Sequence, residues 1–154
     1  MQAGVPATIG VISDTHGELN PRVREVFDGV DLIVHAGDVG GPQILIELEA
    51  IAPVVVARGN TDTGSWAHDL PERASFRVGD TLGVVVHDSR QADLPDSATV
   101  VISGHTHRPT VTRRRGVLHL NPGSASDSRC PGARESVALL RVGQGVPTAR
   151  IVTL

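Results

Sequence analysis

The residues best suited to chemistry are His105 and His107, in the segment Gly104-His105-Thr106-His107. They follow the apolar run 100–102 and stand two positions apart. Side chains repeat with period two in an extended chain, so both imidazoles are expected to point to the same side. This spacing predicts that the two histidines are metal ligands.

Four other apolar runs also end in polar residues that can bind metal. These residues are Asp14 and His16, Asp38, Asn60, and His87. Ligands collect outside the carboxyl ends of the strands in open α/β sheets, so the five runs predict one shared site. Gly37, Gly59 and Gly104 lie next to these residues, where the backbone is expected to turn sharply or pass close to an ion.

The donor set consists of imidazole nitrogens with carboxylate and amide oxygens, and it contains no thiolate. Such donors favour Mn, Fe, Ni or Zn in a site unlike a cysteine-based structural zinc site. Seven side chains are too many for one ion that keeps open positions. They suit two ions roughly 3.5–4 Å apart that share a bridging carboxylate. An ion pair of this kind generates hydroxide near neutral pH and holds the attacking and leaving oxygens of a phosphoryl displacement.

The elements that must position these residues can be read from apolar periodicity. Between Thr8 and Ala57, the order strand, helix, strand, helix, strand predicts a parallel sheet with right-handed crossovers. The helices are expected to start at Asn20-Pro21, with Asn20 as N-cap, and at Gly41-Pro42. The later chain reads as hairpins, with turns at Gly79-Asp80, 113–116 and 143–145, so part of the architecture should be antiparallel.

Composition limits the classes of partner. At 154 residues we expect one domain over residues 1–154. A net charge of −3, two Phe, one Trp and no Tyr argue against nucleic-acid binding. No apolar run is long enough to cross a bilayer, and no signal peptide is evident. With the single residue Cys130, this predicts a cytoplasmic protein. The oligomeric state is left open, homo-oligomers included.

The ordered motifs resemble the calcineurin-like metallophosphoesterases. They are D-x-H at 14–16, G-D at 37–38, G-N at 59–60, a lone strand-end His87, and G-H-T-H at 104–107. The chain length, G-N-x-D at 59–62 and N-P-G-S at 121–124 resemble the small bacterial and archaeal phosphodiesterases of this family (YfcE-like).

The resemblance implies an α/β fold, a four-layer α/β/β/α sandwich of two mixed sheets. It implies that one metal is held by Asp14, His16, Asp38 and His107, and the other by Asp38, Asn60, His87 and His105, with Asp38 as the bridge. We expect two divalent ions, first of all Mn, and catalytic roles for Asp38, Asn60 and His105. The expected substrate is a small phosphate ester, a phosphodiester in preference to a monoester. The alternatives are a non-catalytic metal-binding scaffold and a nuclease; retention of all seven ligand types favours the enzyme.

Two departures from the family pattern concern the substrate cleft. Relatives often read H-G-H where this chain has His87-Asp88-Ser89, and they often place a helix between His87 and His105, where this chain has room for only a turn. Thr61 stands where many relatives of the superfamily have a catalytic His, as is usual for this branch, so the acid for the leaving group is unassigned.

Other polar residues have simpler interpretations. We expect His35 to support the site and His119 to be structural, while His68 should be a surface loop residue. Arg58 could contact substrate phosphate or brace its loop through an ion pair. Asp62 is expected to hold the loop after Asn60.

Overall fold

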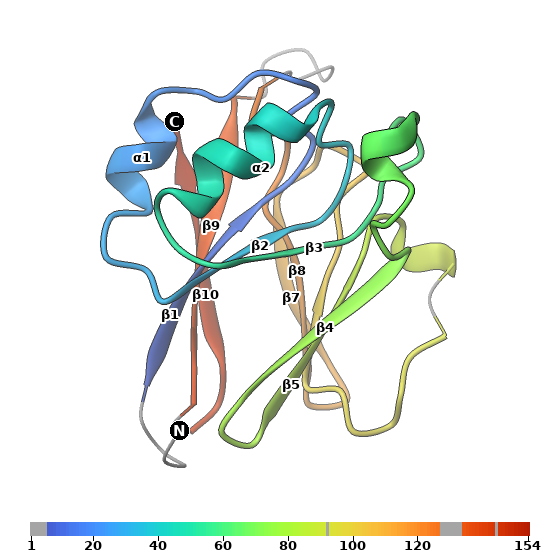
Figure 1. Cartoon of the computed structure of the whole chain (residues 1–154). Helices are drawn as coiled ribbons and strands as arrows, with labels where there is room; N and C mark the ends of the chain where they lie inside the picture. Colours follow the sequence, from blue (N-terminus) through green and yellow to red (C-terminus); the bar gives the residue numbers. More distant parts are fainter. Residues whose placement is uncertain (1–5, 92, 127–133, 144) are drawn as a thin grey trace.

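Two five-stranded sheets stack face to face (Figure 1). The structure, a computed structural model, describes residues 6–91, 93–126, 134–143 and 145–154. The strand order is β10-β9-β1-β2-β3 in the first sheet and β4-β5-β6-β8-β7 in the second. Both sheets are mixed, as the family resemblance implied.

The elements have the following bounds. The first sheet contains β1 (Ala7–Ile12), β2 (Leu32–His35), β3 (Val54–Val56), β9 (Ser136–Val142) and β10 (Thr148–Thr153). The second contains β4 (Arg73–Val78), β5 (Thr81–Val86), β6 (Val100–Ile102), β7 (Thr110–Arg114) and β8 (Val117–Asn121). The described helices are α1 (Arg22–Val26), α2 (Pro42–Glu49), and the 3-10 turns η1 (Ser65–Ala67) and η2 (Ser89–Gln91).

The predicted parallel unit is confirmed in the first sheet. β1 pairs in parallel with β2, with Val11 opposite Val34, and β2 pairs in parallel with β3, with Val34 opposite Val55. These strands are rich in apolar residues because the second sheet covers one face and the helices cover the other. Their carboxyl ends therefore meet at one edge of the sheet.

The second sheet also has a parallel centre, which the sequence did not predict. β5, β6 and β8 run parallel, with β4 and β7 antiparallel at the two edges. This brings the ends of β5, β6 and β8 to one edge, so His87, the G-H-T-H segment and Asn121 leave the sheet side by side.

Two apolar cores hold the layers together. Ile9 and Val11 on one face of β1 join the core between the sheets, which also contains Ile102. Ile12 faces the other way and packs with Phe27 and the residues of α1 and α2. The alternation along β1 therefore produces both cores.

The outer layer on the second sheet is thin. Its outer face carries a small cluster of Val84, Val86 and Ala98, with Leu94 packed against it. Within residues 88–91 and 93–104, the described helical element is η2, a single 3-10 turn. The expected sandwich of two mixed sheets is confirmed, and the short interval between His87 and His105 explains why this layer is reduced.

Three local predictions need correction or fall outside the description. Helix α1 has Pro21 as N-cap instead of Asn20, although the Asn20 Oδ1 atom still accepts a hydrogen bond from the backbone N–H of Arg22 at 2.9 Å. β7 continues to Arg114, which limits the hairpin turn to the next two residues. The loop predicted over 127–133, with Cys130, lies outside the described residues. No described helix is long and apolar enough to span a bilayer.

Candidate metal centre

The first group of candidate ligands forms where the loop after β1 meets the G-H-T-H segment. His16 Nε2 lies 3.7 Å from Asp14 Oδ1 and 4.0 Å from Asp38 Oδ2. His107 Nε2 lies 3.2 Å from the same Asp14 Oδ1 atom. Ligand atoms of Asp14, His16 and His107 all fall within 4.8 Å of one another, close enough to share one ion.

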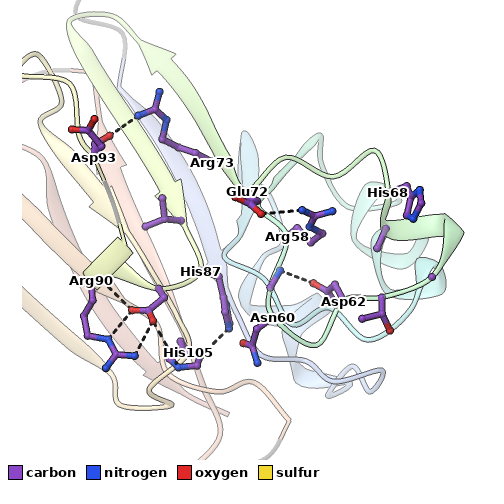
Figure 2. A pocket seen from close by; sticks show the side chains of 16 residues that line it. Arg58, Asn60, Asp62, His68, Glu72, Arg73, His87, Arg90, Asp93 and His105 are labelled. Carbon is purple, nitrogen blue, oxygen red and sulfur yellow. Dashed lines mark hydrogen bonds and ion pairs between the residues drawn. The ribbon is translucent and has the colours of Figure 1, made fainter.

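A second group extends from Asp38 toward the second sheet. His87 Nε2 is 3.2 Å from Asp38 Oδ2, and His105 Nδ1 is 3.3 Å from His87 Nε2. Asn60 lines the same cleft as His87 and His105 (Figure 2). The fold thus brings all seven predicted side chains to one region, with Asp38 between the two groups.

The local geometry fits a bound cation. Asp14 Oδ1 and His16 Nε2 are buried and have no hydrogen-bond partner among the described residues. Buried polar atoms of this kind are rare in native proteins, and a bound ion is one explanation for them. Both atoms belong to the first group, so the two unsatisfied atoms lie where the candidate ligands converge.

Hydrogen bonds to the protein occupy one atom of each key ligand and leave the other one facing this space. Ser13 Oγ donates to Asp14 Oδ2 at 2.5 Å, and the backbone N–H of Thr61 donates to Asp38 Oδ1 at 2.9 Å. His87 Nδ1 donates to the Ala36 carbonyl at 2.8 Å. A histidine fixed through one nitrogen presents the other to a metal, as is usual for metal-binding histidines.

The charges of Asp38 and His87 are coupled. Burial alone would raise the pKa of Asp38, but hydrogen bonds from His87 and Thr61 outweigh it and hold the pKa well below its usual range. Burial would lower the pKa of His87, but hydrogen bonds with Asp38 and the Ala36 carbonyl raise it above 6.5. In the absence of metal, the Asp38 carboxylate therefore favours the protonated form of His87.

The backbone at the site is unusual. Five of the seven candidate ligands have positive φ: Asp14 (56°), His16 (47°), Asp38 (55°), His105 (73°) and His107 (62°). The extended-chain argument for His105 and His107 was therefore wrong, because the segment turns at both residues. That turn directs His107 to Asp14 and His105 to His87.

Glycines let the loops pack this closely. A Cβ atom at Gly37 would lie 2.7 Å from His87 Nδ1, and a Cβ atom at Gly104 would lie 2.7 Å from Asp14 Oδ2. A Cβ atom at Gly59 would collide with Asp38. The three glycines therefore allow close contact with the candidate ligands or their neighbours, and a close approach to an ion stays a prediction.

His35 supports the site without facing it. Thr15 Oγ1 donates to the Val39 carbonyl at 2.7 Å, so His35 Nε2 must donate to Thr15 Oγ1 at 3.0 Å, while the Gly37 N–H donates to His35 Nδ1 at 3.1 Å. This pattern requires the neutral ring. Burial, followed by the nearby His87, lowers the pKa of His35 to about 3. The predicted supporting role is confirmed.

The N-P-G-S segment braces the site, a function that the motif alone did not reveal. Asn121 Nδ2 donates to the Gly104 carbonyl at 3.0 Å and to Thr106 Oγ1 at 3.1 Å. Ser124 Oγ donates to the Asp14 carbonyl at 3.0 Å. The segment therefore links the G-H-T-H turn to the loop after β1. The signal that could have found it is its position at the end of a strand parallel to β6.

A cleft of about 920 Å³ extends from the second ligand group between the loops that follow β3 and β5 (Figure 2). Arg58 lines it and pairs with Glu72 at 3.1 Å, which supports the bracing alternative for Arg58. Asp62 accepts hydrogen bonds from the N–H groups of Gly40 and Gly59, so it holds the loop as predicted. His68 is exposed and lines the cleft.

Comparison with known proteins agrees with this fold. The calcineurin-like phosphoesterase superfamily domain matches residues 8–145. A probable metallophosphoesterase of Methanothermobacter thermautotrophicus is 40% identical over 149 residues, covering 87% of this chain and 85% of that protein. Phosphodiesterase YfcE of Escherichia coli K12 is 31% identical over 147 residues, covering 74% of this chain and 77% of that protein.

The fold also occurs in a protein named for vacuolar protein sorting. The solved structure of vacuolar protein sorting 29 from Cryptosporidium parvum matches with a TM-score of 0.77 at 20% identity, covering 97% of this chain and 98% of that chain. The family match and the curated relatives define the class: this chain belongs to the calcineurin-like phosphoesterase superfamily. Within it, the curated relatives include metallophosphoesterases and YfcE phosphodiesterases, as the sequence motifs predicted.

Proposed function

We propose that this protein is a dinuclear metal-dependent phosphodiesterase. The observation that carries the proposal is the position of Asp38 Oδ2, which lies 4.0 Å from His16 Nε2 and 3.2 Å from His87 Nε2. One carboxylate oxygen between two histidines of separate groups is the arrangement that a bridging ligand needs.

The proposed ligand sets follow the two groups. One ion would be held by Asp14, His16, Asp38 and His107. The other would be held by Asp38, Asn60, His87 and His105. Asp14 also lies within reach of the second group, since ligand atoms of Asp14, Asp38 and His87 fall within 4.8 Å of one another. Of the two carboxylates, Asp38 is the better bridge, because its free oxygen faces a histidine of each group.

The chain's own residues bind and orient the reacting phosphate. Divalent ions, when bound, supply a nucleophile at neutral pH by acidifying water and stabilise charge on the phosphoryl oxygens. Asp38 would hold both ions, while Asn60 and His105 form the side of the centre that opens into the cleft. In the hydrolysis, a water molecule loses a proton as its oxygen bonds to phosphorus, the bond to the leaving ester oxygen breaks, and that oxygen takes up a proton. The residues that accept and donate these protons are unassigned.

We further propose Mn as the working ion and a small phosphodiester as the substrate, with a monoester as the second choice. The borderline donor set of His, Asp and Asn supports Mn, Fe, Ni or Zn over softer ions. The acidic net charge and the few aromatic residues disfavour a nuclease. We also propose that the chain acts as one domain in the cytoplasm, on the basis of its length and its single cysteine.

Hydrolysis of bis(4-nitrophenyl) phosphate tests this proposal against the scaffold alternative. Protein stripped of metal should be inactive, and added Mn should restore turnover. Full activity after chelation would remove the metal mechanism. Tight binding of Mn without turnover of this diester or of 4-nitrophenyl phosphate would favour the scaffold.

A further inference from the structure

The cleft is larger than a phosphate group requires. Its volume of about 920 Å³ is at the upper end of ordinary small-molecule sites. Of the seven candidate ligands, only Asn60, His87 and His105 line it. Most of the cleft therefore lies beside the metal centre. This space is available to the part of the substrate other than the reacting phosphate group.

The described lining carries three guanidinium groups and four carboxylates, those of Asp62, Glu72, Asp88 and Asp93, and it has no large aromatic ring. Arg58, Arg73 and Arg90 all face the cleft, whereas its described lining includes neither of the Phe residues nor the Trp. A nucleobase or aryl group would find no aromatic platform there beyond histidine rings. An anionic group would find its charged donors in these arginines, of which Arg58 and Arg90 are each already paired with a carboxylate.

Arg90 differs from the other two arginines in its position. Arg58 is held by Glu72, and Arg73 donates to the Asp93 carbonyl at 2.5 Å. Arg90 lies on the same side of the cleft as His105 (Figure 2). Of the three arginines, Arg90 is the one that is linked to the metal centre through a carboxylate. That carboxylate belongs to Asp88, which contacts both Arg90 and His105.

Asp88 holds Arg90 in a two-point fork. Asp88 Oδ1 accepts from Arg90 Nε at 3.1 Å, and Asp88 Oδ2 accepts from Arg90 Nη2 at 2.9 Å. The same Oδ2 atom lies 4.0 Å from His105 Nε2. A fork uses two of the five N–H groups of an arginine and restrains its flexible side chain, so less entropy is lost when the remaining donors bind an anion.

We propose that the Asp88–Arg90 fork is a substrate-specificity element that binds a second anionic group, carboxylate or phosphate, on the retained alcohol of the diester. The inference rests on the proposed phosphodiesterase function. The fork stands directly after His87, where the family pattern H-G-H is absent from this chain. Asp88 fixes the guanidinium beside His105, so the second charge must lie close to the scissile phosphate.

Two matched esters test this inference. 4-Nitrophenyl phenyl phosphate and 4-nitrophenyl 3-carboxyphenyl phosphate share one leaving group and differ by one carboxylate. Wild-type Mn-loaded protein should prefer the carboxylated ester in kcat/KM by about tenfold, the scale of one hydrogen bond to a charged group. Arg90→Gln should bring the ratio of the two kcat/KM values close to one. Arg22→Gln, which removes an exposed arginine paired with Glu25 on α1, should keep the wild-type ratio.

The outcomes are distinct. An equal loss on both esters in Arg90→Gln would mean that Arg90 acts on the reacting phosphate or shapes the centre, and would overturn the inference. An unchanged ratio would overturn it as well. If the wild type hydrolyses neither ester, the proposed function fails; calorimetric titration of the two intact esters then decides whether Arg90 confers a preference for the carboxylate.

Discussion

Asp38 Oδ2 lies 3.2 Å from His87 Nε2, across the junction of the two sheets. Asp38 follows β2 of the first sheet, and His87 follows β5 of the second. The candidate centre is therefore assembled only when the sheets stack, and the core between them positions its ligands.

Replacing Asp38 by Asn tests its bridging role. Asn keeps the size and tolerates the positive φ of 55° at this position, but it removes the charge that two cations would share. Turnover of bis(4-nitrophenyl) phosphate should fall by more than the roughly 10–100-fold typical of residues that only support a ligand. Asp28→Asn, at an exposed position of the first sheet's helical layer, is the control. Near-normal turnover in Asp38→Asn would exclude the bridge.

His105 and His107 should serve different ions. Their side chains face different partners, His87 and Asp14 respectively. His105→Ala and His107→Ala should each lower bound Mn from two toward one per chain, measured by metal analysis after dialysis with limited Mn. Turnover should fall sharply in both, because the reaction needs the two ions together. His119→Ala, on the second sheet away from the centre, should retain both ions. Two tightly bound ions in both site variants would make these histidines structural.

Binding of Mn should tighten as the pH rises. Hydrogen bonds with Asp38 and Ala36 outweigh burial and raise the pKa of His87 above 6.5, so a proton occupies the ligand nitrogen over a larger part of the neutral range. An ion must displace that proton, and binding therefore strengthens until the pH exceeds the raised pKa. Calorimetric titrations at pH 6, 7 and 8 in buffers of different ionisation enthalpy should show tighter binding with pH and proton release. Affinity independent of pH would contradict the His87 assignment.

His35 should make the metal-free protein sensitive to acid. Burial lowers its folded pKa to about 3 from 6.5, so below pH 6.5 the unfolded chain takes up a proton that the folded chain refuses. Stability from this group is complete above 6.5 and declines as the pH falls toward 3, by up to about 1.4 kcal/mol per pH unit.

Urea unfolding of the wild type and of His35→Asn at pH 7, 5.5 and 4.5 measures this contribution. Asn keeps an acceptor for the Gly37 N–H and does not titrate. The stability of the wild type relative to the variant should fall with pH, because other titrating groups cancel in the difference. A difference that stays constant with pH would show that His35 is protonated in the folded protein.

Much of the fold was predictable because its strands are apolar runs with polar ends. The β1-β2-β3 unit and the convergence of ligands from Asp14 to His107 follow from that pattern. The parallel centre of the second sheet was not predictable, since the segments before β6 and β8 are too short and irregular to look like crossovers. Its consequence, the contact of Asn121 with Gly104, depends on pairing between distant strands.

The cleft was less predictable than the ligands. In the sequence, Asp88 stands out only as a departure from H-G-H. Nothing in Asp88-Ser89-Arg90 indicates the direction in which the arginine side chain points. The 3-10 turn η2 decides this by bringing Arg90 back onto Asp88. Arg58 was left open between two roles, and the ion pair with Glu72 is a tertiary contact that spacing cannot reveal.

The left-handed backbone at five candidate ligands has a consequence for how this lineage can change. A residue other than glycine costs roughly 1–2 kcal/mol in that conformation, and asparagine or aspartate less. At His16, with φ of 47°, metal binding and conformational stability therefore favour different residues. A copy of the gene released from selection for metal binding should drift toward Gly or Asn at His16, His105 and His107 before its core changes. Such replacements would mark loss of the metal in sequences whose fold remains intact.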